Sequence, residues 1–480
     1  MEILDLATKA LDGIIHLSTK RLAAKEKAEP LPEVAPSIMK NEDANTFICG
    51  FSSAEVMPAD VDTAKYYIAG YRINHPVTGV KDPTTVSAMW LGCKEGEGIL
   101  LLCADVVGLT GYDVNLVRAS LADFCKEKGC KNISISCSHT HASIDTVGYW
   151  GPLPMSGRNE SYQKQLFAAL KKVAIEAWQN RTVGNLYMGD ISVPEAIEDH
   201  REPIFCNDKL TRLRFVPADG SAETWFMNYS AHPNTMGGDN TLISADYPCY
   251  MRRRINETKK VNVLFAVGAI AAVDIAPSVA EDRTERTERG GQILADAAWK
   301  IDNDELLKSE ITVLCQPYYA PVDNCLLALM PTIGAVTSVK APCKEGKLGM
   351  ALITEMTYLK IGSRQILMIP GEAFPENIYG GYADAEHSAT GLPADINSTP
   401  LAEIADDANL VVFGVTNDMT GYMVPKNDFV LHPTQAYINT WHDRFDRHHY
   451  HETNSLGYLT TDNMEKVFSG MMKRVRDAQK

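Results

Sequence analysis

The fold class of this chain is decided by residues 98–141, which read GILLLCADVVGLTGYDVNLVRASLADFCKEKGCKNISISCSHTH. The stretch from Gly98 to Asp105 is an almost unbroken apolar run, which predicts a buried strand. Residues 113–128 have the apolar spacing of a helix, and residues 132–138 have the pattern of a second strand. A strand, a helix and another strand in this order predict an α/β fold.

The alternation of strands and helices continues outside this segment. A helix is predicted over residues 160–180, and strand–helix pairs recur in residues 261–300 and from residue 365 onward. We therefore expect an α/β fold made of layered mixed β-sheets with flanking helices. No second apolar core begins near the end of the sequence, so we expect one large domain over residues 46–480.

Residues 1–45 differ from the rest of the chain. Up to about residue 25 the apolar side chains have helical spacing, which predicts an amphipathic helix. Residues 29–45 contain three prolines and many charges, which is typical of a linker. We expect a helical arm and linker over residues 1–45. The helix could dock on its own domain or on a second copy of the chain, and we favour a homo-oligomer.

The composition excludes several classes of protein. Among 480 residues, 61 acidic side chains outnumber 46 basic ones, and the formal net charge of −15 argues against a nucleic-acid partner. The longest apolar stretch, Val263 to Val273, has 11 residues and is too short to span a membrane, so we expect no membrane partner. The N-terminus does not resemble a signal peptide, and the 11 cysteines include no Cys-x-x-Cys pair. These features favour a cytoplasmic protein.

Side chains able to bind a metal follow four of the predicted strands. They are His139 and His141 after residues 133–138, His232 after 225–231, Glu372 after 365–370, and Tyr422 beyond 410–415. Ligands of α/β sheets bind beyond the strand ends, so groups placed there can converge. Two imidazoles and a carboxylate suit zinc and leave one position for water. Each motif alone is more often a turn or a packing residue, so the motifs form a site only if they meet in space.

The order of these motifs resembles the neutral ceramidase family, whose catalytic domain is a zinc-dependent amidase. The resemblance extends in order over most of residues 46–460, in short blocks. The blocks are Gly50–Pro58, Ala69–Tyr71, Cys137–His141, Asp199–Pro203, Ala231–Pro233, Val273–Pro277, Ile369–Glu372 and Asn417–Tyr422. The resemblance implies the α/β catalytic domain of that family and one zinc ion (Zn2+) per chain.

The resemblance also implies roles for individual residues. The implied zinc ligands are His139, His232, Glu372 and Tyr422, with His141 beside the metal as proton donor and acceptor. Arg201 and Tyr450 are implied to hold the substrate carbonyl or the product carboxylate. Zinc lowers the pKa of a bound water to about 7 and polarises a carbonyl group. A guanidinium and a phenol can stabilise the oxyanion that develops.

The sequence departs from the family at three places. Ala142 to Asp145 stand where the family has a glycine-rich turn, so we expect Asp145 to reshape the substrate wall and to bind substrate. Ala276 stands where the family has a serine often assigned a catalytic role, which excludes a serine nucleophile at this position. Only 30 residues follow Tyr450, so we expect no C-terminal immunoglobulin-like domain. We therefore expect a small polar substrate and not ceramide.

Residues 441–452 contain four histidines and have three interpretations. They could form a second metal site, a loop that lines the pocket, or a solvated polar loop. The spacing fits no zinc template well, and the position beside Tyr450 favours a lining loop in which His442 and His449 touch substrate. Asp105 and Asp274 lie in buried strands, and we expect them to orient a histidine or the chain turn.

The leading hypothesis is a cytoplasmic single-zinc hydrolase, in which zinc-activated water cleaves an amide bond of a small polar molecule. One alternative keeps the metal site but acts as a hydrolase or lyase on a carbohydrate, such as a glycoside or a uronide. Asp145, Arg201 and the histidine-rich loop would suit hydroxyls and a carboxylate. Another alternative is a non-catalytic binding protein, which is motivated by Ala276.

Overall fold

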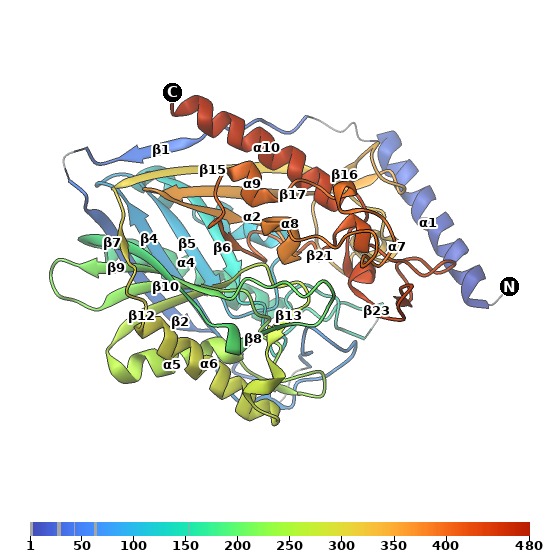
Figure 1. Ribbon diagram of the computed structural model, residues 1–480, viewed down its shortest axis with the longest axis horizontal. Helices are drawn as coiled ribbons and strands as arrows, with labels where there is room; N and C mark the ends of the chain where they lie inside the picture. Colours follow the sequence, from blue (N-terminus) through green and yellow to red (C-terminus); the bar gives the residue numbers. More distant parts are fainter. Residues whose placement is uncertain (1–2, 26–29, 43, 62–64, 153) are drawn as a thin grey trace.

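The computed structural model describes residues 3–25, 30–42, 44–61, 65–152 and 154–480. In this part of the chain two β-sheets are stacked at the centre, and helices cover both outer faces (Figure 1). The order of the layers is therefore helices, sheet, sheet and helices. This confirms the predicted α/β class with layered mixed sheets and flanking helices.

The larger sheet has nine strands in the order β12-β10-β9-β7-β2-β4-β5-β6, with β14 paired to β7. The strands are β2 (Phe47–Glu55), β4 (Thr85–Gly92), β5 (Gly98–Ala104), β6 (Cys130–Cys137), β7 (Thr182–Ser192), β9 (Lys209–Pro217), β10 (Glu223–Tyr229), β12 (Val261–Val267) and β14 (Glu305–Leu306). The pairs β5–β6 and β10–β12 are parallel and the other pairs are antiparallel, so the sheet is mixed.

The smaller sheet has six strands in the order β1-β15-β17-β18-β20, with β16 paired to β17. The strands are β1 (Ser37–Lys40), β15 (Glu310–Pro321), β16 (Lys340–Pro342), β17 (Met350–Ile361), β18 (Arg364–Met368) and β20 (Val411–Phe413). The pair β18–β20 is parallel. One apolar core lies between the two sheets, where the ring of Phe226 from β10 stacks on that of Phe413 from β20 at 4.7 Å.

The helices form the two outer layers. Those of the larger sheet are α2 (Gly111–Ser120), α3 (Ala122–Lys128), α4 (Glu160–Gln179), α5 (Tyr247–Thr258) and α6 (Arg283–Trp299). Those of the smaller sheet are α1 (Ile3–Lys25), α7 (Cys325–Ile333), α8 (Pro375–Tyr379), α9 (Leu401–Ala405) and α10 (Thr460–Ala478). In Figure 1, α9 and α10 lie above the stacked sheets, and α5 and α6 lie below them. In the described part of the chain, no helix is both long and apolar enough to cross a membrane.

Four small two-stranded sheets lie beside the main layers. They are β3 (Gly79–Val80) with β11 (Leu242–Ile243), β8 (Ile197–Asp199) with β13 (Val273–Ile275), β19 (Glu372–Ala373) with β21 (Tyr422–Met423), and β22 (Trp441–His442) with β23 (His448–His449). Short 3-10 helices are η1 (Pro194–Ala196), η2 (Pro277–Val279), η3 (Ala394–Ile396), η4 (Lys426–Asp428) and η5 (His451–Asn454). Several of these short elements carry residues of the candidate site.

Two local predictions differ from the structure. The helix predicted over residues 113–128 is divided into α2 and α3, because Leu121 between them leaves the helical region at φ −105° and ψ 3°. The predicted linker contains β1, which pairs with β15 because Ser37 to Lys40 supply an edge strand to the smaller sheet. Residues 29 and 43 of that linker lie outside the described residues, as do residues 26–28 before it.

The N-terminal helix α1 contacts α7 and β16. Its residue Ile15 is buried in the apolar cluster that the smaller sheet shares with its helices. The helix thus docks on its own chain. The boundary between an N-terminal arm over residues 1–45 and a domain over residues 46–480 stays a prediction. The homo-oligomer also stays a prediction.

Candidate metal centre

The residues after β6, β10 and β18 meet at one place, although β6 and β10 are separated by five strands in the order of the larger sheet. The segment around residue 415 connects them. The Cys137 amide at the end of β6 donates to the Val415 carbonyl at 3.0 Å, and the Gly414 amide donates to the Val267 carbonyl of β12 at 2.8 Å. Since β12 pairs with β10, this segment brings the ends of both strands to the same site.

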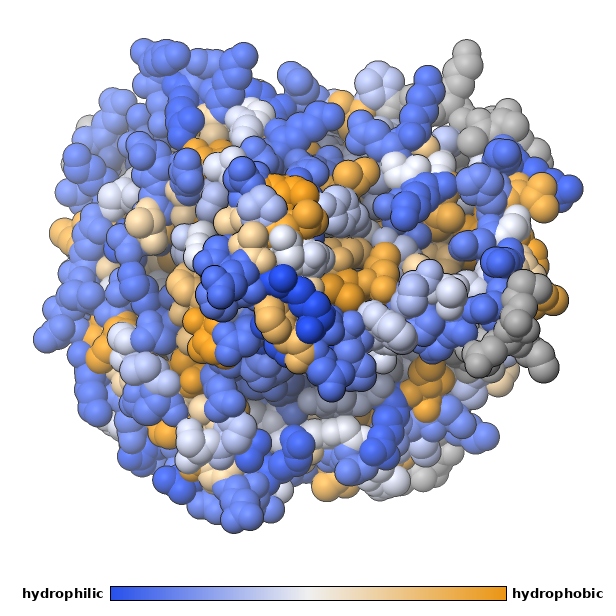
Figure 2. All heavy atoms as spheres, turned by 45° about the vertical axis from the view of Figure 1, so that its right-hand side comes forward, coloured by the Kyte–Doolittle hydropathy of each residue, from blue (hydrophilic) through white to orange (hydrophobic). Residues whose placement is uncertain are grey.

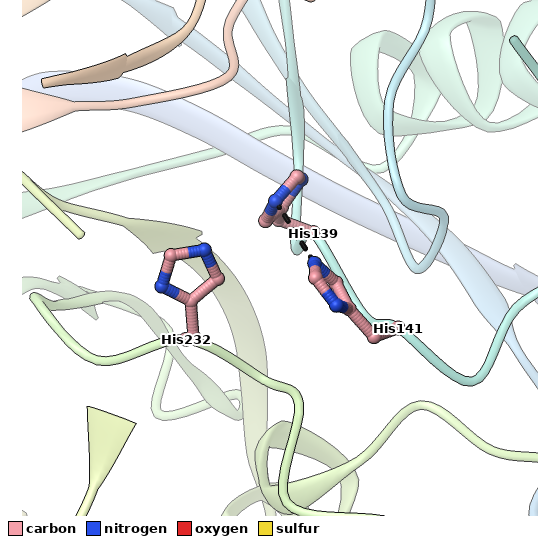
Figure 3. Close-up of side chains that lie close together, drawn as sticks. All are labelled: His139, His141 and His232. Carbon is pink, nitrogen blue, oxygen red and sulfur yellow. Dashed lines mark hydrogen bonds between the residues drawn. The ribbon is translucent and has the colours of Figure 1, made fainter. Parts of the chain in front are cut away.

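Three imidazoles, which Figure 3 shows, and the carboxylate of Glu372 form the centre of the site. Nε2 of His139 lies 3.2 Å from Nε2 of His141 and 3.4 Å from Oε2 of Glu372. Nε2 of His232 lies 2.8 Å from the same Glu372 oxygen. Each histidine offers one nitrogen, and these three atoms lie within 4.8 Å of one another. The structure therefore contains a buried three-histidine group that could hold a metal ion.

The outer ring nitrogens explain how two of the histidines are oriented. Nδ1 of His139 lies 2.5 Å from the Val107 carbonyl oxygen, and Nδ1 of His232 lies 3.2 Å from the Val273 carbonyl oxygen. A carbonyl only accepts, so the proton sits on Nδ1 and the lone pair of Nε2 faces the centre. Metal-binding histidines are held in the same way.

The donor set fits a zinc-like ion. At bond lengths of about 2.0–2.1 Å, tetrahedral donor atoms are about 3.3 Å apart, close to the 3.4 Å between Nε2 of His139 and Oε2 of Glu372. Burial, together with the neighbouring His139 and His232, puts the pKa of His141 well below its usual value. Burial raises the pKa of Glu372. The charges and hydrogen bonds of His139 and His232 have the larger, opposite effect, and the pKa of Glu372 therefore lies well below its usual range. Glu372 is thus in the ionised form that binds metals, whereas its hydrogen bond and charge outweigh burial and raise the pKa of His232, so a metal ion would have to displace the proton on Nε2 of His232.

One polar atom of the group is left without a partner. Nδ1 of His141 is buried and has no hydrogen-bond partner in the described part of the chain. Its ring packs edge-on against Tyr71 at 4.9 Å between ring centres. Gly70 leaves room for this ring, since a Cβ at position 70 would overlap the imidazole.

The backbone around the site is strained. His139, Ala272, Val415 and Asn417 all have positive φ, between 44° and 67°. Left-handed backbone at residues other than glycine costs about 1–3 kcal/mol each, and it concentrates at functional sites because the surrounding structure must hold it. Val415 is the most unusual of the four, because a β-branched side chain seldom tolerates this conformation.

A cavity of about 670 Å³ opens onto the three histidines. Its apolar part includes a wall formed by α7 and other segments, with Leu326, Leu327, Met330, Val336, Leu352 and Leu456. Its polar part includes Tyr71, His200, Asn234, Asp274, His448 and Tyr450. Figure 2 turns this side of the molecule forward and shows hydrophobic side chains near the centre of the face, with hydrophilic side chains around them.

Solved structures share this architecture. The neutral ceramidase of Pseudomonas aeruginosa is 15% identical, with a TM-score of 0.67, and the match covers 90% of this chain and 75% of that one. A ceramidase complexed with C2 is 14% identical, with a TM-score of 0.68, and the match covers 91% of this chain and 76% of that one. The chain has the neutral ceramidase fold. A scan with protein-family models and a search of the curated proteins both gave no match.

Within this neutral ceramidase fold, several of the predicted site residues do line the cavity. They are His139, His141, His232, Glu372, Tyr422, Tyr450 and Asp274. The Tyr422 ring lies 6.5 Å from the His232 ring and 6.2 Å from the Tyr450 ring. Asp274 accepts a hydrogen bond from Asn234 at 2.9 Å and lies 3.8 Å from Nδ1 of His232, too far for a hydrogen bond, so its role in orienting a histidine stays a prediction.

Other predicted residues lie away from the cavity wall. Asp145 accepts hydrogen bonds from the Val147, Gly148 and Trp150 amides, so it shapes a loop instead of facing the cavity. Asp105 forms an ion pair with Arg252 at 2.6 Å and accepts a hydrogen bond from the Thr85 hydroxyl at 2.7 Å.

The histidine-rich loop is divided between two environments. His442 is exposed on β22, where it packs against His448, and His448 itself lines the cavity. His449 is buried between Asp443 and Glu452. In the described residues, no group of three metal-binding side chains occurs in this loop. Arg201 is buried beneath the same loop and is absent from the cavity wall.

The sequence analysis did not identify His200, Tyr71, His448 or the apolar wall of α7 as parts of the site. His200 and Tyr71 lie inside the blocks that carried the family resemblance, so their positions in those blocks could have identified them as candidate site residues. The wall of α7 gave a weaker signal, since its apolar run is equally typical of a core helix.

Proposed function

We propose that this chain is a metal-dependent hydrolase that cleaves an amide bond. The observation that carries the proposal is the meeting of three buried imidazoles and the Glu372 carboxylate at the end of a large cavity. The solved neighbours with this fold are ceramidases, which supports hydrolysis of an amide.

The proposed ligands are His139, His232, Glu372 and Tyr422, all at the cavity wall. A zinc-like ion held there would polarise the carbonyl group and increase the acidity of water. Nε2 of His141 lies beside Nε2 of His139, so it can accept a proton from the attacking water and return it to the leaving amine. Tyr450 can hold the carbonyl oxygen, because its side chain also lines the cavity.

The cavity modifies the expected substrate. Its apolar part, which includes Leu326, Leu327 and Met330, does not support a substrate that is small and polar throughout. We propose an amide whose apolar substituent lies against α7 and whose polar substituent lies near Asp274. Among the described lining residues there is no lysine or arginine to neutralise an anion, which disfavours the uronide alternative.

The test combines metal analysis with a substrate screen. Elemental mass spectrometry on the purified protein should find about one zinc per chain. The protein is then offered N-acyl amides of increasing chain length, glycosides and uronides. Hydrolysis of the amides supports the proposal, and cleavage of a sugar substrate replaces it with the carbohydrate alternative. Full metal occupancy without any turnover would indicate the non-catalytic binding protein.

His141→Gln separates the proton-transfer role from metal binding. We expect the variant to keep its metal while turnover falls by about 10²–10⁴-fold, the usual contribution of a general acid–base group. Metal content and kcat are measured on the same sample. Tyr422→Phe is the complementary variant, and we expect it to weaken zinc binding. Loss of metal from His141→Gln but not from Tyr422→Phe would make His141 the fourth ligand.

Leu327→Ala tests the apolar wall. The leucine lines the cavity, and removing part of its side chain should cost an apolar substituent about 1–2 kcal/mol of binding, or roughly tenfold in KM. Ile333→Ala is the control, because Ile333 is on the same helix but is half exposed and absent from the wall. Steady-state kinetics with short and long acyl amides should show the effect of Leu327→Ala on the long ones. Equal effects on both lengths would contradict the proposed position of the apolar substituent.

A further inference from the structure

Arg201 is buried in an ion-pair network next to the cavity. The exposed fraction of its side chain is 9%, and its Nε lies 2.6 Å from Oδ2 of Asp428. Its Nη2 donates to the Asp428 carbonyl oxygen at 2.7 Å and to Oε1 of Glu452 at 3.0 Å. Asp428 is the last residue of η4, and Glu452 lies in η5. Arg201 follows strand β8 closely in the chain, so its side chain connects the end of β8 to both 3-10 helices.

The remaining nitrogen of the guanidinium is directed at His451. Nη1 of Arg201 lies 2.9 Å from Nδ1 of His451. A guanidinium can only donate, so Nδ1 must accept and the proton of the neutral ring must sit on Nε2. This hydrogen bond fixes both the tautomer and the orientation of the His451 ring. Nε2 is buried and has no hydrogen-bond partner in the described residues, so within them the bond to Arg201 is the hydrogen bond that orients the ring.

The His451 ring supports both tyrosines of the candidate site. It stacks on Tyr450 with 3.9 Å between ring centres and 28° between ring planes. It also packs edge-on against Tyr422 at 4.7 Å. A third contact is with Phe374, 5.1 Å away, which directly follows the Glu372 strand β19. A ring in this position restricts how far either tyrosine can turn.

The contacts of Arg201 leave little for a substrate. The side chain does not line the cavity, and its guanidinium also lies 4.7 Å above the ring of Phe374. A substrate carbonyl would have to displace a carboxylate from a buried arginine, which is costly in the protein interior. Arg201 therefore acts on the site through its neighbours.

We propose that Arg201 is a positioning residue, which orients His451 so that the His451 ring holds Tyr422 and Tyr450 at the metal site. The proposal rests on the proposed metal site for the ligand role of Tyr422. It replaces substrate contact as the role of Arg201. Zinc binding by Tyr422 should then depend on Arg201, although Arg201 is not a ligand.

The test is a double-mutant cycle with zinc affinity as the first measurement. Arg201→Gln and His451→Leu are each expected to weaken zinc binding by about 10–100-fold, as does loss of a group that orients a metal ligand. The double variant should be no weaker than the worse single variant, because both changes break the same connection. His451→Leu keeps the ion pairs of Arg201, so it remains informative if Arg201→Gln does not fold.

Arg212→Gln is the matched control. Arg212 is also buried, with 3% of its side chain exposed, and it pairs with Asp304 at 2.8 Å away from the cavity. It should lose stability without any change in zinc affinity. KM and kcat are measured for all variants, and positioning predicts a fall in kcat with little change in KM.

Two results would overturn the positioning role. One is additive effects of Arg201→Gln and His451→Leu. The other is a raised KM for Arg201→Gln at unchanged zinc affinity, which would mean that the guanidinium reaches the substrate. A wild-type protein that binds zinc but hydrolyses no amide would overturn the proposed reaction alone, because the zinc affinities still decide the role of Arg201. A wild-type protein that takes up no zinc would overturn both.

Discussion

Glu372→Gln should lose the metal and, with it, turnover. Glu372 supplies the carboxylate that lies 2.8 Å from His232 and 3.4 Å from His139. An amide keeps the shape of the side chain but removes the negative charge that a dication needs. We expect zinc affinity to fall by more than the roughly 10–100-fold that follows loss of a supporting hydrogen bond. Elemental mass spectrometry and amide hydrolysis on the same sample measure both effects.

Glu376→Gln is the matched control for this change. Glu376 is four positions further on, equally buried, and absent from the cavity wall. Burial raises the pKa of Glu376 to about 8, so at neutral pH its carboxyl group is mostly protonated and a glutamine replaces it without loss of charge. Zinc content and turnover should stay near the wild-type values. Full zinc content in Glu372→Gln, or equal losses in both variants, would mean that Glu372 is not a ligand.

The layers of the fold could be predicted from the sequence because the apolar runs are long. The apolar run over residues 98–105 became β5, and residues 132–138, in which isoleucine and serine alternate, became most of β6. A buried strand must place an apolar side chain at nearly every position, so its pattern survives in a single sequence. The division of the helix predicted over residues 113–128 could not be predicted from the sequence. Only Leu121 departs from helical backbone, and this leaves the spacing of the apolar side chains almost unchanged.

The meeting of His139 with His232 could not be derived from strand ends alone. Five strands separate β6 from β10 in the sheet order, and the contact depends on the segment around Val415. That segment has a backbone conformation that its sequence does not favour. The family resemblance supplied the grouping that the residue pattern left open.

The partners of Arg201 were equally hidden. His451 and Glu452 are 250 and 251 positions away, and no periodicity connects them to Arg201. An arginine beside a catalytic motif is compatible with substrate binding and with a buried ion pair. Burial decides between the two, and burial is a property of the packed chain.

Gly421→Ala should be among the most damaging substitutions in the chain. Gly421 has φ +84°, and a Cβ at this position would overlap the backbone oxygen of Asn454. The carbonyl of Gly421 also accepts a hydrogen bond from the Glu372 amide at 3.1 Å, which joins β19 to β21. The methyl group would therefore push the Tyr422 strand away from both Asn454 and Glu372.

Gly96→Ala separates the two causes of this damage. Gly96 has φ +85°, almost the same as Gly421, but no heavy atom lies within 4 Å of the Cβ it would carry. Left-handed backbone should cost both variants about 1–2 kcal/mol of unfolding free energy. The overlap with Asn454 should cost Gly421→Ala about 1–3 kcal/mol more. Equilibrium unfolding in urea measures the difference.

Zinc affinity adds a second comparison between these two glycines. Gly96 lies in the turn before β5 and should leave zinc binding unchanged when replaced by alanine. Gly421 precedes Tyr422, so its replacement should weaken zinc binding even in the fraction of protein that stays folded. If Gly421→Ala and Gly96→Ala lost equal stability, the close approach of Gly421 to Asn454 would not constrain the fold. If Gly421→Ala bound zinc as tightly as wild type, the position of β21 would not determine the metal site.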